Sequence, residues 1–126
     1  MDRAVGRLGW IQVDTADPMK LAEFWGAVLG RPILDPLEDP PQYVGLQPID
    51  AGVIVSFQRV PEAKVVKNRL HFDIQADDVA QAQASIEALG GARLPMEDFL
   101  EDGYAWRQMA DPDGNEFCLI FETPDV

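Results

Sequence analysis

The sequence predicts an α+β fold in which two βαβββ repeats form a cup-shaped mixed β-sheet with the helices on the outside. The first observation behind this prediction is the order of elements, because a strand, a helix and three strands are expected twice along the chain. The second is a period of about 61 to 63 residues between matching positions of the two halves. The third is the alternation of polar and apolar side chains in the strands, which leaves each half with an apolar sheet face that its own helix must cover.

Pairs of residues at matching positions make the repeat visible. These pairs are Trp10 with His71, Gln12 with Asp73, Asp17 with Asp78, and Val55 with Cys118. We therefore expect a first repeat at residues 7–60, a linker at 61–67 and a second repeat at 68–122. At 126 residues the whole chain, 1–126, is expected to be a single domain with a proper core.

The first repeat is expected to begin with a strand at residues 8–14 and to continue with a helix at residues 18–29. Asp17 is a suitable N-cap, Pro18 occupies the first helical position, and Gly30 ends the helix. Extended segments are then expected at residues 32–37, 43–47 and 53–60. The last of these is the strongest strand, because it is rich in β-branched and aromatic residues.

The second repeat is expected to begin with a half-buried strand at residues 68–75, which contains the only histidine of the chain. Alternation places Leu70, Phe72 and Ile74 toward a helix. The opposite face then carries the side chains available for chemistry or binding, namely Arg69, His71, Asp73 and Gln75. Further elements are expected as a helix at residues 78–89, strands at 93–96, 104–110 and 116–122, and a purely structural turn at 111–115.

Charge and composition exclude several classes of partner. The formal net charge is −12, whereas binding to nucleic acid or to an anionic membrane surface depends on a basic footprint. No apolar stretch approaches the roughly 20 residues of a membrane span. A single cysteine excludes an internal disulfide framework, and the first residues do not resemble a signal peptide. We therefore expect a cytoplasmic protein with no nucleic-acid or membrane partner.

Three stretches of the chain together resemble the vicinal oxygen chelate superfamily, which includes glyoxalase I, the bleomycin-resistance proteins and the extradiol dioxygenases. These stretches are residues 17–30, residues 68–73 with the sequence NRLHFD, and residues 111–117 with the sequence DPDGNEF. The resemblance covers nearly the whole chain and is closest to glyoxalase-like domains of undefined substrate. It implies the two-repeat fold, a small-molecule ligand and a homodimer.

The resemblance also implies where a divalent metal ion would bind in metal-dependent members, with one ligand from each of four strands. Carried over to this chain, the four positions fall on Trp10, Val55, His71 and Cys118. Only His71 is an ordinary ligand for the hard divalent ions of such enzymes. We therefore expect no cofactor and no conventional metal centre. The alternative is a divalent metal ion with His71 as a weak candidate ligand.

Strand parity predicts which side chains line the inside of the cup. Flat apolar surface with a few hydrogen-bonding groups is typical of a small-molecule site. The predicted ligand-binding residues are Trp10, Gln12, Val55, Phe57, Arg59, Arg69, His71, Asp73, Trp106, Gln108, Glu116 and Cys118. Arg59 and Arg69 are expected to attract an anionic or carbonyl-bearing ligand. The alternative is that the basic residues around them pair with acids across a subunit interface.

Each candidate also has a purely structural interpretation. His71 could be a strand histidine whose hydrogen bonding is satisfied by Asp73. Cys118 could be a small buried apolar residue. Trp10 and Trp106 could simply pack the cup.

Three functions are consistent with these patterns. The first is a metal-independent small-molecule-binding domain, either sequestering a compound as bleomycin-resistance proteins do or responding to a ligand. The second is a metal-dependent lyase, isomerase or dioxygenase in which His71 and Glu116 are the candidate catalytic residues. The third is a dimerisation module. The missing metal ligands favour the first, and neither the substrate nor the reaction is encoded in a recognisable motif.

Overall fold

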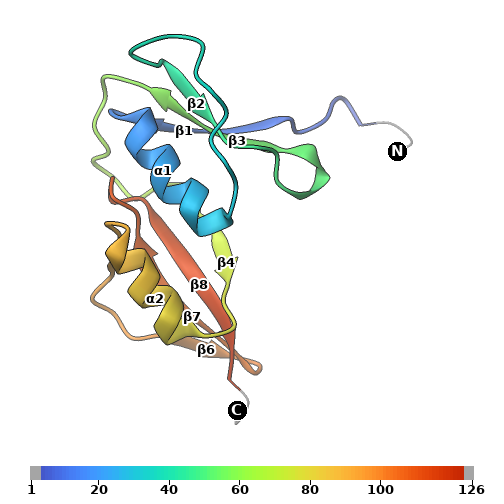
Figure 1. Cartoon of the computed structure of the whole chain (residues 1–126). Coiled ribbons are helices and arrows are strands. Elements are labelled where there is room, and N and C mark those ends of the chain that lie inside the picture. The colour runs from blue at the N-terminus through green and yellow to red at the C-terminus, as the bar shows by residue number, and fades with distance from the viewer. Residues whose placement is uncertain (1–3, 124–126) are drawn as a thin grey trace. The chain divides into compact units, whose positions relative to one another are not determined.

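The computed structural model describes residues 4–123, and its contacts divide the chain into two compact units, Met1–Ala63 and Lys64–Val126. Each unit contains one α-helix and its own open, mixed β-sheet (Figure 1). The predicted α+β class is therefore confirmed. Within residues 4–123, no helix is long and apolar enough to cross a membrane.

Unit 1 contains a three-stranded sheet with one helix against it. The strand order is β1-β3-β2, with β1 parallel and β2 antiparallel to β3. In place of the extended segment predicted at 32–37, the structure has an isolated bridge between Ile33 and Leu46. The elements of this unit are β1 (Trp10–Thr15), α1 (Pro18–Leu29), β2 (Tyr43–Gly45), a short 3-10 helix (Asp50–Gly52) and β3 (Ile54–Arg59).

Helix α1 has the bounds and the ends that the sequence predicts. The Asp17 side chain accepts a hydrogen bond from the Lys20 backbone N–H at 3.2 Å, and Pro18 begins the helix. Gly30 ends it with a left-handed φ of 65°, which glycine adopts without strain. Leu21 and Trp25 are buried on the helix, which packs on the sheet and so closes the core of unit 1.

Unit 2 contains a five-stranded sheet with the second helix against it. The strand order is β4-β8-β7-β5, β6 also pairs with β7, and β4 is parallel to β8. Strands β7 and β8 have the predicted bounds. The elements are β4 (Asp73–Gln75), α2 (Val79–Ala88), β5 (Ala92–Arg93), β6 (Phe99–Glu101), β7 (Tyr104–Ala110) and β8 (Glu116–Glu122).

Strand β6 is absent from the sequence prediction, although the sequence contains a signal for it. Asp102 and Gly103 join β6 to β7, and both have positive φ, at 50° and 82°. An Asp-Gly pair between two extended segments is the usual two-residue turn of a β-hairpin. The end of this strand borders the pocket described below.

The strand predicted at residues 68–75 is shorter than expected. Only Asp73–Gln75 form β4. The Phe72 carbonyl still accepts a hydrogen bond from the Cys118 N–H of β8, and residues 68–71 lie outside any strand. The Asn68 side chain donates to the backbone carbonyls of Leu70 and Glu116, and such side-chain bonds compete with strand pairing. Strand parity therefore gives no placement for Arg69, which is exposed and lies before the strand.

Among the described residues, the sheet of unit 2 has one face that the helix covers and one face that no helix of this unit covers. In unit 2, Met109 pairs with Phe117 and Arg107 with Leu119 on the face that α2 covers. The opposite face carries the alternate residues of these strands. Between β7 and β8, Trp106 pairs with Ile120 and Gln108 with Cys118. Cys118 is also paired with Asp73 of β4, the other neighbour of β8. We call this opposite face the open face of unit 2. It agrees with the parity prediction for these residues.

In unit 1 the predicted inward placement of Val55, Phe57 and Arg59 is wrong. Val55 pairs with Ile11 and Phe57 with Val13, so both lie on the helix-covered face, where their exposed fractions are 2% and 0%. The cause is the register of the two parallel strands, which a single-strand pattern does not encode. Because β1 pairs Gln12 with Ser56 as β4 pairs Asp73 with Cys118, the counterpart of Cys118 is Ser56 and not Val55.

Candidate functional site

A shallow pocket lies on the open face of unit 2. Its cavity volume is about 460 Å³, which lies within the range of small-molecule sites. Residues from β4, β6, β7 and β8, or directly next to these strands, line it. They are His71, Asp73, Glu101, Asp102, Tyr104, Trp106 and Ile120. Three of the seven were among the residues predicted from sequence, namely His71, Asp73 and Trp106.

Aromatic side chains of β7 provide the flat part of the pocket. Trp106 lies opposite Ile120 in the sheet, and its ring lies 6.5 Å from that of Phe99. Tyr104, two residues earlier on the same strand, has 46% of its surface exposed. Alternation along the strand could have identified Tyr104, because it shares a face with Trp106.

His71 and Asp73 form the polar end of the pocket. The Nε2 atom of His71 lies 3.1 Å from an Oδ1 atom of Asp73, and about half of each side chain is exposed. The thiol of Cys118 is close to both, since one donor atom from each of the three residues lies within 4.8 Å of the others. Burial, followed by the charge of Asp73, raises the pKa of the Cys118 thiol above its ordinary value.

The donors present do not fit the metal centre that the superfamily resemblance implies. Of its four positions, Trp10 and Val55 offer no ligand atom for a hard divalent ion, and Val55 is buried under α1. His71 and Cys118 do lie close together, and Asp73 adds a third donor that is not one of the four positions. An imidazole, a thiolate and a carboxylate are together typical of zinc ligation.

The basic residues predicted for the ligand site do not line this pocket. Arg59 donates through Nη1 to the Ala16 carbonyl at 2.7 Å and through Nε to the Pro41 carbonyl at 3.3 Å, so it ties together the backbone of unit 1. Arg69 is exposed and is not among the lining residues. No lysine or arginine lines the pocket in the described part of the chain, whereas Asp73, Glu101 and Asp102 do.

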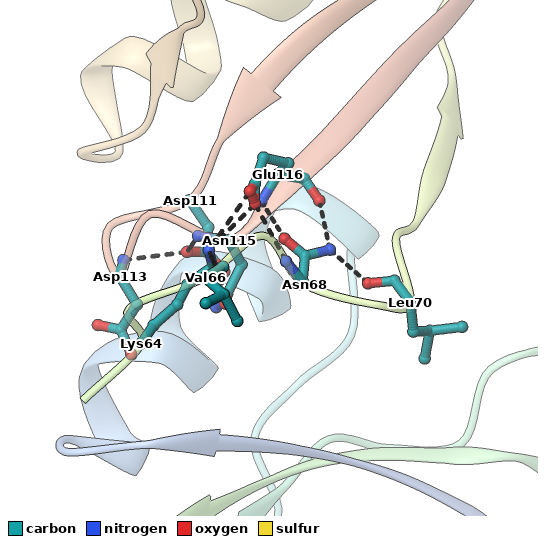
Figure 2. Close-up of polar contacts among 8 residues, drawn as sticks. All are labelled: Lys64, Val66, Asn68, Leu70, Asp111, Asp113, Asn115 and Glu116. Carbon is teal, nitrogen blue, oxygen red and sulfur yellow. Dashed lines mark hydrogen bonds and ion pairs between the residues drawn. The ribbon is translucent and has the colours of Figure 1, made fainter. Parts of the chain in front are cut away.

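Glu116 takes part in a network that holds the start of β8 to the segment preceding His71 (Figure 2). Its carboxylate lies 3.1 Å from the Lys64 ammonium and accepts a hydrogen bond from the Asn68 backbone N–H. The Asn68 side chain in turn accepts from the Glu116 N–H at 2.8 Å and donates to the Glu116 and Leu70 carbonyls.

The pKa of Glu116 reflects this engagement. Burial raises the pKa, but the hydrogen bonds from Lys64, from the Asn68 backbone and from its own backbone outweigh burial and lower it. The carboxylate is therefore ionised at neutral pH and engaged by a lysine. These contacts give Glu116 a positioning role and leave His71 as the catalytic candidate that lines the pocket.

The turn at residues 111–115 is held by one aspartate, as the structural interpretation predicts (Figure 2). The Asp111 carboxylate accepts hydrogen bonds from the backbone N–H groups of Asp113 and Asn115 at 3.0 and 2.9 Å. It also accepts one from the Asn115 side chain at 2.9 Å. The turn thus fixes the connection between β7 and β8, and with it the register of the open face.

The remaining predicted residues are not among those that line this pocket. Gln108 is on the open face of unit 2, paired with Cys118, but does not line the pocket. Trp10, which is 61% exposed, and Gln12 are on the sheet face of unit 1 opposite α1. Four residues that line the pocket are absent from the sequence prediction, namely Glu101, Asp102, Tyr104 and Ile120. The first two are absent because β6 is not predicted.

Comparisons with known proteins agree on one fold. A family model described as a glyoxalase-like domain matches residues 10–120. No curated protein matches the chain.

Several solved structures are similar over almost their whole length. A glyoxalase/bleomycin resistance protein/dioxygenase family enzyme from Burkholderia phytofirmans PsJN has a TM-score of 0.71 at 16% identity, covering 94% of this chain and 100% of its own. The fosfomycin resistance protein FosX from Listeria monocytogenes also has a TM-score of 0.71, at 17% identity, with coverages of 95% and 96%. A hypothetical protein from S. aureus has a TM-score of 0.66 at 20% identity, with coverages of 93% and 97%. At these identities the likeness shows the fold.

Proposed function

Because the chain belongs to the glyoxalase-like domain family of the vicinal oxygen chelate superfamily, we propose that it is a small-molecule-binding domain whose ligand occupies the pocket of unit 2. The proposal does not require the four-ligand hard-metal centre, because Trp10 stands at one of its positions and the buried Ser56, the counterpart of Cys118, at another. The observation that carries it is the lining of the pocket, in which aromatic surface lies beside a histidine–aspartate pair.

The aromatic part of the pocket favours a flat ligand. Trp106, Tyr104 and Ile120 offer adjacent apolar surface on two paired strands. Stacking on such side chains is worth about 0.5–1.5 kcal/mol beyond the burial of area. The sheet positions these rings before the ligand arrives, so little conformational entropy is lost on binding.

The charge of the pocket favours a basic ligand. Asp73, Glu101 and Asp102 line it, and Trp106 and Tyr104 present rings that attract cations through their faces. This preference replaces the anionic ligand expected from sequence, because Arg59 serves the backbone of unit 1 instead. We propose a planar, cationic or amine-bearing organic molecule as the ligand class.

The second candidate function is enzymatic, and the pair of His71 and Asp73 is the observation that favours it. At 3.1 Å, Asp73 can hold the imidazole in a fixed orientation, as a general acid or base requires. A lyase, isomerase or dioxygenase reaction would use His71 in this way. The contacts of Glu116 with Lys64 and Asn68 argue against a second catalytic carboxylate at that position.

A screen with matched ligand pairs tests the binding proposal. Each pair consists of an aromatic amine and the carboxylic acid of the same ring system, and binding is measured by thermal shift and then by calorimetry. We expect the amines to bind more tightly, and Trp106→Ala to weaken the best ligand by about 10-fold, because roughly 1.4 kcal/mol of stacking and burial is lost. Trp10→Ala, which removes an exposed tryptophan of unit 1, is the matched control and should leave the affinity unchanged.

Two outcomes would contradict the proposal. If acids and amines bound equally, the acidic lining would not select the ligand. If the affinity depended on Trp10 and not on Trp106, the ligand would not occupy the pocket of unit 2.

A further inference from the structure

We infer that His71, Asp73 and Cys118 form a three-ligand site for a thiophilic divalent metal ion, with Zn²⁺ as the best match. This set differs from the four-strand set that the superfamily resemblance implies. All three donors belong to unit 2, one of them is a thiol, and Asp73 is not at one of the four implied positions. The inference does not depend on the organic ligand proposed above, since metal binding is measured without it.

The positions of the three donors follow from the strand pairing of unit 2. His71 and Asp73 are two residues apart, and their side chains meet at 3.1 Å. Asp73 lies directly opposite Cys118 in the parallel pair of β4 and β8, which brings the carboxylate beside the thiol. The backbone pairing thus holds Asp73 against Cys118, and the Cys118 N–H also donates to the Phe72 carbonyl at 3.0 Å, which fixes the segment between the two other ligands.

The distances suit a tetrahedral ion after small side-chain rotations. One donor atom from each residue lies within 4.8 Å of the others. Bonds of about 2.0–2.3 Å to nitrogen, oxygen and sulfur separate the ligands of a tetrahedral zinc ion by roughly 3.3–3.8 Å. Because His71 and Asp73 are half exposed, their side chains can make this adjustment without moving the strands.

The chemistry of the donors selects among metals. Thiolate and imidazole ligands favour Zn²⁺ over Mg²⁺ and Mn²⁺, which prefer oxygen donors. Three protein ligands leave a fourth position, the arrangement of zinc sites that take a water or a substrate atom. Glu101 and Asp102 stay outside this set of ligands, so the pocket keeps acidic groups for a basic ligand when the metal is bound.

A cobalt and zinc titration of the chelator-treated chain of 126 residues tests the inference. Co²⁺ reports thiolate ligation through a sulfur-to-cobalt charge-transfer band, and calorimetry gives the affinity for Zn²⁺, Mg²⁺ and Mn²⁺. We expect one equivalent of Co²⁺ with that band, and Zn²⁺ binding at least about 100-fold tighter than Mg²⁺ or Mn²⁺.

Three variants connect the signal to the residues. Cys118→Ser should abolish the charge-transfer band, and Cys118→Ser, Asp73→Asn and His71→Ala should each weaken Zn²⁺ at least about 10-fold, since even the loss of an outer-sphere partner costs that much. Asp14→Asn, an exposed carboxylate of β1, is the control and should bind like the parent. Circular dichroism and the urea midpoint confirm that each variant is folded.

Several results would overturn the inference. They are the absence of a charge-transfer band in the folded parent protein, a band that persists in Cys118→Ser, or equal affinity for Zn²⁺ and Mn²⁺. Failure of the proposed organic-ligand binding is seen separately, because the ligand screen measures binding of organic amines and acids, whereas this titration measures binding of the metal ions alone.

Discussion

The two units share the arrangement of one helix and three of their strands and differ in the chemistry of one sheet face. In each, the first strand is parallel to the last, a helix follows the first strand, and a third strand is antiparallel to the last. Unit 1 has Trp10, Gln12 and Ser56 at the positions where unit 2 has His71, Asp73 and Cys118. Only unit 2 places three potential metal ligands together among the described residues. The helix-covered faces therefore determine the fold of both units, whereas the residues of the opposite face can differ in chemistry without changing it.

The first strands of the two units also differ in how they are positioned. Strand β1 has six residues, and β3 pairs with every one of them. Strand β4 has only three, and the preceding segment is held by the Asn68 and Glu116 network instead. His71 therefore lies just before the regular strand, between the Asn68 side chain and the Phe72 carbonyl, which accepts from the Cys118 N–H. Figure 2 shows the hydrogen bonds of Asn68 to Leu70 and Glu116.

The largest expected effect concerns the two faces of unit 1. Phe57→Ala should lower the free energy of unfolding by about 3–5 kcal/mol, because it leaves a cavity in the core under α1. Trp10→Ala, at an exposed position on the other face, should change it by no more than about 0.5 kcal/mol. Urea unfolding of the two variants measures both values. Similar losses for both would mean that the two faces do not differ in burial as described.

An intermediate effect is expected from an ion pair on the helix-covered face of unit 2. Arg107 donates to both carboxylate oxygens of Asp98 at 2.9 and 3.0 Å and to the Gln83 side chain at 2.8 Å. The hydrogen bond from Arg107 outweighs burial and lowers the pKa of Asp98. Asp98→Asn should lower the free energy of unfolding by about 1.5–3 kcal/mol at neutral pH, the usual range for hydrogen bonds to charged groups.

The sign of the pH dependence follows from the lowered pKa. The stabilisation by Asp98 is fully present above the pKa of the unfolded chain and is lost as the pH falls through the lower, folded value. The difference in urea midpoint between parent and Asp98→Asn should therefore be constant near neutrality and shrink below about pH 4. A difference that stayed constant into strong acid would show that ionisation of Asp98 does not contribute.

The sequence was most informative where local chemistry determines structure. Asp17 and Gly30 predicted both ends of α1, and the turn residues at 111–115 predicted the connection that sets β7 against β8. Alternation along these strands then placed Trp106 and Cys118 on one face. Each of these features depends on residues that are close together in the sequence, so one sequence by itself is enough to predict it.

The errors have a common physical origin in contacts between distant residues. Alternation in β3 shows that Val55 and Phe57 share a face, but only its pairing with β1 determines which face that is. The placement of Arg59 rested on the same alternation along β3. Its side chain instead donates hydrogen bonds to the carbonyls of Ala16 and Pro41, which are distant in sequence. The omission of β6 has another cause, because it did not depend on distant contacts. The Asp102-Gly103 turn is a local signal for a hairpin and is visible in the sequence.

The smallest expected effect on stability is the most informative about the site. Asn68→Ala removes hydrogen bonds to Leu70 and Glu116 on the segment that leads to His71, and should lower the free energy of unfolding by about 1–2 kcal/mol. It should also weaken Zn²⁺ binding, because His71 would then be less well positioned.

Asn115→Ala is the matched control, since it removes a side-chain bond to Asp111 within the turn and leaves the His71 segment intact. Urea midpoints and zinc calorimetry of the two variants separate the effects. Equal zinc affinity in both would show that the network stabilises the fold without positioning His71, and the difference between the two units would then rest on the ligand residues alone.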